Sequence, residues 1–247
     1  MTRGGDNSQS MRALVQLRDM LLNGRFAPGE RLSELRLVDM LGASRSPVRL
    51  ALTRLEHEGL LEMRPSGGYV VRAFTATELK DAIELRGVLE GSAARLAAER
   101  GCAPQCLERM QECSDAMETI VCSGGEELDS LTRYMELNDE FHSLLMDLAG
   151  SGVLKRAIAH ALTLPFAAPS AFVLEDRQHE MFVVAQCQHR EMLEAIRNRE
   201  GARAESIGRE HARLAARSLR LRLGDGRHES RHDSPTPSHL MGRAERA

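Results

Sequence analysis

Apolar residues recur with helical spacing along almost the whole chain, and only residues 60–72 favour β-strands. Two strands are predicted there, over 60–63 and 69–72, joined by a turn rich in glycine. The predicted helices lie near residues 14–21, 33–41, 44–58, 77–100, 106–122, 127–149, 153–164, 176–199 and 202–221. The fold class is therefore mainly α, with one small hairpin.

Residues 33–58 predict two helices joined by a tight turn. Ser33 and Ser44 stand at N-cap positions, and Gly42 lies where a helix end favours positive φ. The second helix carries the apolar stripe Val48, Ala51, Leu52 and Leu55, and its opposite face presents Arg45, Ser46, Arg49 and Thr53. An ordinary helical hairpin is the commoner structure for such a pair. The arginine face, Pro47 in the first turn and the following hairpin together favour a DNA-recognition helix.

The hairpin after this helix has the position of the wing in a winged helix-turn-helix. Two adjacent glycines lie in its turn, where the backbone could approach DNA closely. The predicted DNA contacts are Ser44, Arg45, Ser46 and Arg49 in the major groove, and Gly67 and Gly68 at phosphate or the minor groove.

The chain of 247 residues is long enough for two domains. We place a winged helix-turn-helix domain at residues 10–73 and an all-α helical bundle at residues 78–223. Thr77 is expected to cap the first bundle helix. Residues 1–9 and 224–247 lack a periodic apolar pattern and are expected to be disordered.

Composition excludes several classes of protein. No apolar run approaches the length of a membrane helix, and the first ten residues lack the apolar core of a secretory signal. The five cysteines show no paired spacing, so we interpret them as reduced thiols of a cytoplasmic protein. The net charge is −3, yet arginines outnumber acidic residues within residues 41–72, where DNA phosphates would lie.

Three histidines lie on apolar helical stripes, where histidine is unusual. His189 and His211 fall on the last two predicted helices, and His142 lies at the shoulder of a third stripe, one turn after Asn138. Each alone fits a core histidine with an ordinary hydrogen-bond partner. Three on three inward faces favour a shared metal ion instead. The remaining histidines are assigned to the surface or the tail, namely His57, His160, His179, His228, His232 and His239.

A cation held by neutral ligands keeps its charge and open coordination positions, so it favours an anion with an oxygen donor. We therefore expect the effector to be a small carboxylate. Arg86 lies among small residues on a helix face that it shares with Glu90, and we expect it to bind this effector. The alternative is that Arg86 pairs with Glu90 one turn away.

The segment PGERLSELRLVDMLGASRSPVRLALTRLEHEGLLEMRPSGGYVV resembles the DNA-binding domain of GntR-type bacterial transcriptional regulators. The shared features are the PG-x-x-L opening, S-R-x-P-V-R, and L-x-x-E-G-L before a glycine-containing wing. Some members of that family carry a DNA-contacting arginine where this chain has Leu35, so that contact is not transferred.

The segments AIELRGVLEGSAARLAAERG, NDEFHSLL, QHREMLEAI and REHARLAARS resemble the FCD ligand-binding domain of the subgroup named after the fatty-acid regulator. The metal-binding pattern of that domain implies the ligands Asn138, His142, His189 and His211. The first position holds Asn where Asp is commoner, and a neutral amide is the weaker ligand. The implied ion is zinc, with nickel or manganese as alternatives. DAIELRGVLEGSAARLAAERG and LPFAAP further resemble the vanillate-responsive repressors.

Together these features predict a cytoplasmic, homodimeric regulator, most simply a repressor, that binds a palindromic operator and has no enzyme activity. Its effector would be a small organic acid, with vanillate as first choice and a sugar acid or short hydroxy acid as second. Two alternatives stay open. One is a metal sensor. The other is a metalloenzyme, against which we note that no buried Glu or Asp is evident near the histidines.

Overall fold

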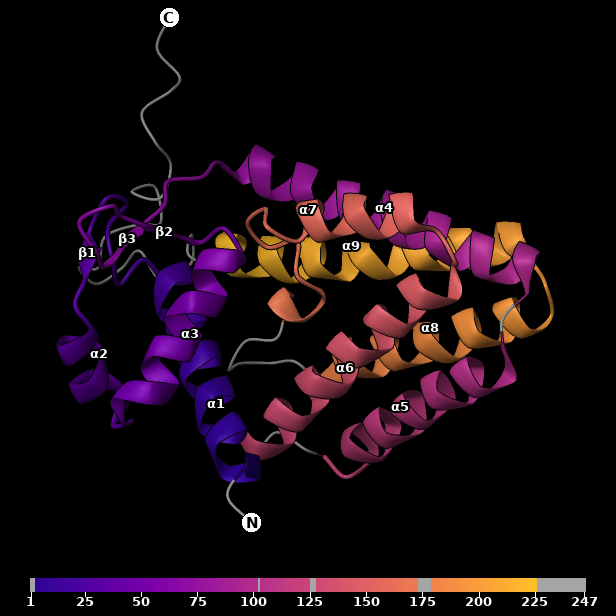
Figure 1. Cartoon of the computed structure of the whole chain (residues 1–247), viewed down its shortest axis with the longest axis horizontal. Coiled ribbons are helices and arrows are strands. Elements are labelled where there is room, and N and C mark those ends of the chain that lie inside the picture. Colours follow the sequence, from indigo (N-terminus) through magenta and orange to yellow (C-terminus); the bar gives the residue numbers. More distant parts are fainter. Residues whose placement is uncertain (1–2, 102, 125–127, 173–178, 226–247) are drawn as a thin grey trace, which may run out of the picture.

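The computed structural model describes residues 3–101, 103–124, 128–172 and 179–225. Its elements are α1 (Arg3–Leu22), β1 (Arg31–Leu32), α2 (Glu34–Leu41), α3 (Arg45–His57), β2 (Leu61–Met63), β3 (Tyr69–Val71), α4 (Ala76–Arg100), α5 (Pro104–Cys122), α6 (Leu128–Leu148), α7 (Gly152–Ala161), the 3-10 helix η1 (Pro169–Phe172), α8 (His179–Arg197) and α9 (Gly201–Asp225). The mainly α fold class is confirmed. Figure 1 shows the elements α1–β3 at one end and the helices α4–α9 beside them.

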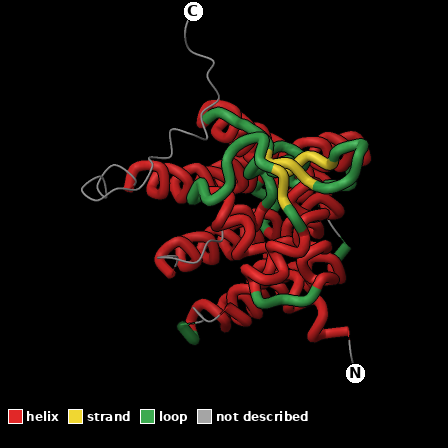
Figure 2. Tube along the Cα trace, turned by 90° about the vertical axis from the view of Figure 1, so that its left-hand side faces the viewer, coloured by secondary structure: helices red, strands yellow, loops and turns green. Residues whose placement is uncertain are grey.

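The N-terminal domain is a winged helix-turn-helix. Gly42 ends α2 with a φ of 58°, as expected from its position, and the stripe of α3 is buried. The small sheet has one strand more than the predicted hairpin, because β1 pairs antiparallel with β3 in the order β1-β3-β2. Figure 2 shows these three strands gathered in one small region of an otherwise helical molecule.

The C-terminal domain is the expected bundle of six α-helices, α4 to α9, among the described residues. Its two longest helices, α4 and α9, lie side by side (Figure 1). Glycine makes this close approach feasible, since a Cβ built on Gly91 would lie 2.8 Å from the carbonyl oxygen of Glu205. Arg86 and His211, which come from these two helices, belong to one polar cluster in which Glu90 and His142 lie between them.

Two local expectations need correction. Thr75, not Thr77, caps α4, because its hydroxyl accepts from the backbone of Glu78 while the Glu78 carboxylate bonds back to it. Helix α1 begins at Arg3, so most of the expected N-terminal disorder is replaced by helix. Adding a turn to an existing helix gains one hydrogen bond per residue and needs no apolar pattern. The expected disordered tail lies, beyond Asp225, outside the described residues.

The two domains share one continuous apolar core that includes Leu52 of α3 and Phe141 of α6. A buried ion pair reinforces the junction. Arg18 donates to both carboxylate oxygens of Glu58, at 2.9 and 2.8 Å, and to the carbonyl oxygen of Ser170 in the other domain, at 3.1 Å. Helix α3, which ends next to Glu58, is thereby held against the bundle.

No described helix is long and apolar enough to cross a membrane.

Candidate functional site

Helix α3 presents its predicted polar face to solvent. Arg45, Ser46 and Arg49 are all exposed, and the side chain of Arg49 is 66% exposed with Glu34 as its ion-pair partner at 3.3 Å. Ser44 is the N-cap residue, but its side chain makes no capping hydrogen bond. The four residues therefore lie at the N-terminal end of α3 on its solvent-exposed side, the arrangement in which a recognition helix reads base edges.

The wing turn carries both predicted glycines with positive φ, 81° for Gly67 and 85° for Gly68. Arg31 of β1 donates to the carbonyl oxygen of Gly67 at 3.0 Å and holds the turn. A side chain on Gly68 would approach the guanidinium of Arg31 to 3.3 Å. The turn is thus shaped by glycine, with its outer edge free to approach a phosphate backbone.

The three predicted histidines converge in the bundle core. His189 Nε2 lies 3.1 Å from His211 Nε2, which lies 3.3 Å from His142 Nε2. All three side chains are at least 96% buried. They come from α8, α9 and α6, so residues far apart in the sequence meet at one point. Among the described residues this is the group of His, Cys, Asp and Glu side chains that could hold a metal ion.

The hydrogen-bond partners of Nδ1 determine the tautomers of His189 and His211. Nδ1 of His189 faces Oε1 of Gln186 at 3.3 Å, and the amide nitrogen of Gln186 is already committed to Ser114. Nδ1 of His211 likewise faces Oε1 of Gln188 at 3.1 Å. An oxygen acceptor demands a proton on Nδ1, so Nε2 keeps its lone pair.

His142 completes the pattern through Glu90 of α4. Its Nδ1 lies 2.9 Å from Oε1 of Glu90, a contact close in distance but imperfect in hydrogen-bond angle. A carboxylate, like the two amides, places the proton on Nδ1. Three lone pairs then face one another with no proton between them. A cation at their meeting point relieves this repulsion, and neutral imidazoles are the ligands that divalent transition metals favour.

Asn138, the fourth predicted ligand, is fully buried one turn before His142 on α6. Its amide nitrogen donates to Oγ of Ser170 at 3.2 Å. Its carbonyl oxygen Oδ1 has no hydrogen-bond partner among the described residues. A buried oxygen without a donor is costly, and a metal ion would supply the missing partner. The three histidines therefore fit a divalent ion, and Asn138 as a fourth ligand stays a prediction.

The position of Glu90 corrects one premise of the sequence analysis. A buried carboxylate does lie beside the histidines, although none was evident from the sequence. Burial alone would raise the pKa of Glu90, but the neighbouring His142 and Arg86 outweigh it and hold the pKa below its ordinary value. Glu90 is thus an anion that orients His142.

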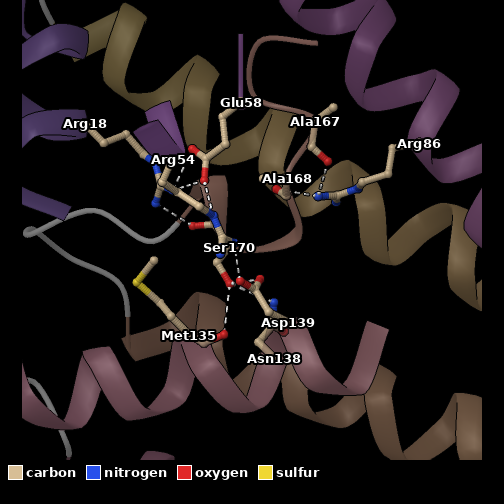
Figure 3. A network of polar contacts seen from close by, with 10 residues as sticks. All are labelled: Arg18, Arg54, Glu58, Arg86, Met135, Asn138, Asp139, Ala167, Ala168 and Ser170. Carbon is tan, nitrogen blue, oxygen red and sulfur yellow. Dashed lines mark hydrogen bonds and ion pairs between the residues drawn. The ribbon is translucent and has the colours of Figure 1, made fainter. Parts of the chain in front are cut away.

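Arg86 contacts an acidic side chain and two backbone carbonyl groups in the bundle core. It forms an ion pair with Glu90, with Nε 3.5 Å from Oε2, and donates to the carbonyl oxygens of Ala168 at 2.9 Å and Ala212 at 3.2 Å. This geometry favours the ion-pair interpretation of Arg86, while its contact with an effector stays a prediction. Figure 3 shows Arg86 reaching the segment that leads to Ser170.

Burial also keeps two of the histidines neutral. The pKa values of His189 and His211 lie well below the ordinary value, because desolvation disfavours the charged rings and nearby positive groups add to the effect. Neutral imidazole is the form that binds a metal. Of the histidines assigned to the surface, His57, His160 and His179 are exposed, and the three tail histidines lie outside the described residues.

A cavity of about 390 Å³ adjoins this cluster and is lined by His142 and Glu90. Its walls include the apolar side chains of Met146, Ile158 and Leu162. This volume and lining suit a small organic molecule.

Two family models match the chain. Residues 81–214 match the FCD domain, and residues 10–71 match the bacterial regulatory proteins of the gntR family. The FCD match alone covers more than half of the chain.

The chain is also similar to individual proteins that are named HTH-type transcriptional regulators. The chain is 32% identical over 145 residues to an uncharacterized HTH-type transcriptional regulator, YdhC of Bacillus subtilis, over 59% of this chain and 62% of that protein. The chain thus spans less than two thirds of that relative. It is 26% identical to the HTH-type transcriptional repressor RspR of Escherichia coli, over 83% of this chain and 86% of that protein. The solved structure of E. coli McbR/YncC matches 86% of this chain and 97% of its own, with 20% identity and a TM-score of 0.57, a likeness of fold.

Proposed function

The chain belongs to the GntR family of bacterial regulatory proteins and carries an FCD domain, and from this premise we propose that it represses transcription under the control of a small carboxylate bound at a metal site. The family and its relatives are regulators, not enzymes. The buried Glu90 therefore does not revive the metalloenzyme alternative. Repression, rather than activation, is supported by the E. coli relative that is named a repressor.

We propose that two copies of α3 read a palindromic operator in the cytoplasm. The support is the exposed polar face of α3 next to a glycine-shaped wing. Arg45 and Arg49 are the side chains long enough to reach guanine edges, and Ser44 and Ser46 suit phosphate or base contacts. Dimerisation through the bundle would match the two-fold symmetry of such an operator.

The metal would be held by the three histidines and Asn138. Convergence of three acceptor Nε2 atoms is the observation that carries this proposal. Zinc is the first choice, and nickel or manganese are alternatives, because each accepts imidazole and oxygen ligands. Bound there, the ion supplies positive charge and an open coordination position for a carboxylate oxygen.

A small aromatic acid such as vanillate is our first choice of effector, ahead of a sugar acid or a short hydroxy acid. The apolar walls of the cavity beside His142 support an acid with a flat apolar body. In this proposal Arg86 acts indirectly, because its ion pair with Glu90 positions the carboxylate beside His142.

Two measurements test the proposal. Elemental analysis of the purified protein should find about one divalent ion per chain, and the His189→Ala variant should lack it. Calorimetry should then detect vanillate binding to the metal-loaded protein and no binding after chelation. Acid binding that survives removal of the metal would contradict the proposed site, and a response to metal alone would favour the metal-sensor alternative.

A further inference from the structure

The cavity beside the histidines is not confined to the bundle. Two residues of the DNA-reading helix α3, Arg54 and His57, line it together with His142 and Glu90. The opposite end of α3 carries Arg45 and Arg49, which face solvent. One helix therefore borders the candidate effector cavity at its C-terminal end and offers its DNA-binding residues at its N-terminal end.

The lining of the cavity combines charged and apolar side chains. His142, whose Nε2 belongs to the histidine cluster, lines it together with the anions Glu90 and Asp139. Its cations are Arg54 and Lys155, and the exposed ring of His57 also lines it. The apolar walls therefore stand beside hydrogen-bond donors that come from α3 as well as from the bundle.

Arg54 is shared between the domains. It donates through Nε to Glu58 of its own domain at 3.1 Å and through Nη2 to Asp139 of the bundle at 2.5 Å. Within the described part of the chain, Nη1 makes no hydrogen bond, and the side chain is 42% exposed. Figure 3 shows Arg54 between Glu58 and the pair Asn138–Asp139. Arg54 can thus accept a further anionic partner without leaving its place.

Hydrogen bonds link Arg54, through Asp139 and Ser170, to Asn138, the proposed fourth ligand beside the histidine cluster. Its Oδ1 accepts from Oγ of Ser170 at 2.8 Å, and that same hydroxyl accepts from the amide of Asn138 at 3.2 Å. Asp139 is therefore fixed beside the cavity, and its negative charge offsets part of the positive charge that Arg54 presents to a ligand.

We propose that the effector spans the cavity from the metal site to helix α3, with a carboxylate at the metal and a hydrogen-bond acceptor at Arg54 and His57. The inference rests on the proposed function, because it assumes a carboxylate at the histidine cluster. It adds the second recognition point and its chemistry, namely a small acid whose far end carries an acceptor oxygen. It also gives the effector direct contact with the helix that reads DNA, so that the ligand acceptor and Asp139 share one guanidinium.

The test compares two acids that share a ring. Benzoate has one carboxylate, whereas terephthalate has a second acceptor group at the far end of the ring. Calorimetry on the metal-loaded full-length protein should give tighter binding for terephthalate, and Arg54→Gln should weaken terephthalate binding by roughly tenfold or more while leaving benzoate nearly unchanged, as expected for loss of a charged hydrogen bond. Asp139→Asn keeps the acceptor for Ser170 but removes a charge, so it should tighten terephthalate binding.

Arg190→Gln is the matched control, since it removes an exposed arginine that, like Arg54, forms an ion pair between two helices, here with Glu118, without touching the cavity. It should leave both acids unchanged, and thermal unfolding of each variant reports whether its fold is retained. Terephthalate binding that is equal in the parent and in Arg54→Gln overturns the spanning arrangement and leaves the metal site intact. If neither acid binds the metal-loaded parent, or if both bind equally after chelation, the carboxylate site itself is wrong and the spanning arrangement is wrong with it.

Discussion

Nδ1 of His142 lies 2.9 Å from Oε1 of Glu90, and this contact determines which nitrogen of His142 is available to a metal ion. The carboxylate keeps the proton on Nδ1 and turns the lone pair of Nε2 toward the other two histidines. Glu90 is in turn held by Arg86 on the same helix, one turn away. The helix α4 thus contributes no metal ligand of its own but orients one.

Replacing this carboxylate tests its orienting role. Glu90→Gln should weaken metal binding by about tenfold to a hundredfold, because losing the hydrogen-bond partner of a metal-bound histidine typically lowers metal affinity by that factor. Competition with a chromogenic chelator measures the affinity. Glu84→Gln is the control, since Glu84 lies on the same helix but pairs with Arg213 at the surface. Equal affinities for Glu90→Gln and the parent would show that His142 is oriented by other groups.

The polar face of α3 should carry DNA specificity. Arg49→Ala and Arg45→Ala should each cost about 1–3 kcal/mol of specific binding if their guanidiniums read guanine edges. Fluorescence anisotropy with an operator obtained by in vitro selection measures the loss. Arg190→Ala, on the bundle helix α8, should bind like the parent. If the two α3 variants also bind like the parent, the recognition surface lies elsewhere.

The metal-free protein should lose stability as the pH falls below about 6.5. The pKa values of His189 and His211 are lowered in the folded protein. Below about pH 6.5 these two histidines therefore bind protons in the unfolded chain but not in the folded one. Above about 6.5 both states hold neutral rings and the histidines contribute no pH dependence. Each histidine can contribute up to about 1.4 kcal/mol per pH unit. Urea unfolding with a chelator at pH 7.5, 6.5 and 5.5 measures the trend, and a flat profile contradicts it.

The buried ion pair at the domain junction should matter for stability. Arg18→Met leaves the carboxylate of Glu58 buried with one fewer partner, and we expect a loss of about 3 kcal/mol in the free energy of unfolding. The double variant Arg18→Met/Glu58→Leu should recover much of that loss, because no unpaired charge remains. Chemical denaturation of both proteins measures the difference. Equal stability of the single and double variants would mean that Arg54 alone satisfies Glu58.

Local patterns predicted most of the elements correctly. The apolar stripe of α3, the positive φ at Gly42 and the inward positions of the three histidines all follow from spacing within one helix. Each depends on neighbours three or four residues away, which the sequence displays directly. The sequence did not predict strand β1, because a strand of two residues is too short to show an alternating pattern.

The partners of the site depend on tertiary contacts that no local pattern displays. Ser170 meets Asn138 only through packing of η1 against α6. The sequence nevertheless contained two indications of buried charged residues. Arg18 lies one turn after Leu14, on the buried side of α1, and Glu90 shares an inner face with small residues of α4. A charged residue on an inward face is a reason to expect a buried partner.

The most direct test is release of operator DNA by an acid in the presence and absence of metal. Vanillate, related benzoates, lactate and gluconate are titrated into the operator complex and followed by fluorescence anisotropy. The same titrations are run on chelated protein and on His189→Ala. We predict that a carboxylate, with vanillate as first choice, dissociates the metal-loaded complex and has no effect on the other two. Release at the same acid concentration in all three samples, or release by non-carboxylate ligands alone, would contradict control through a carboxylate at the metal.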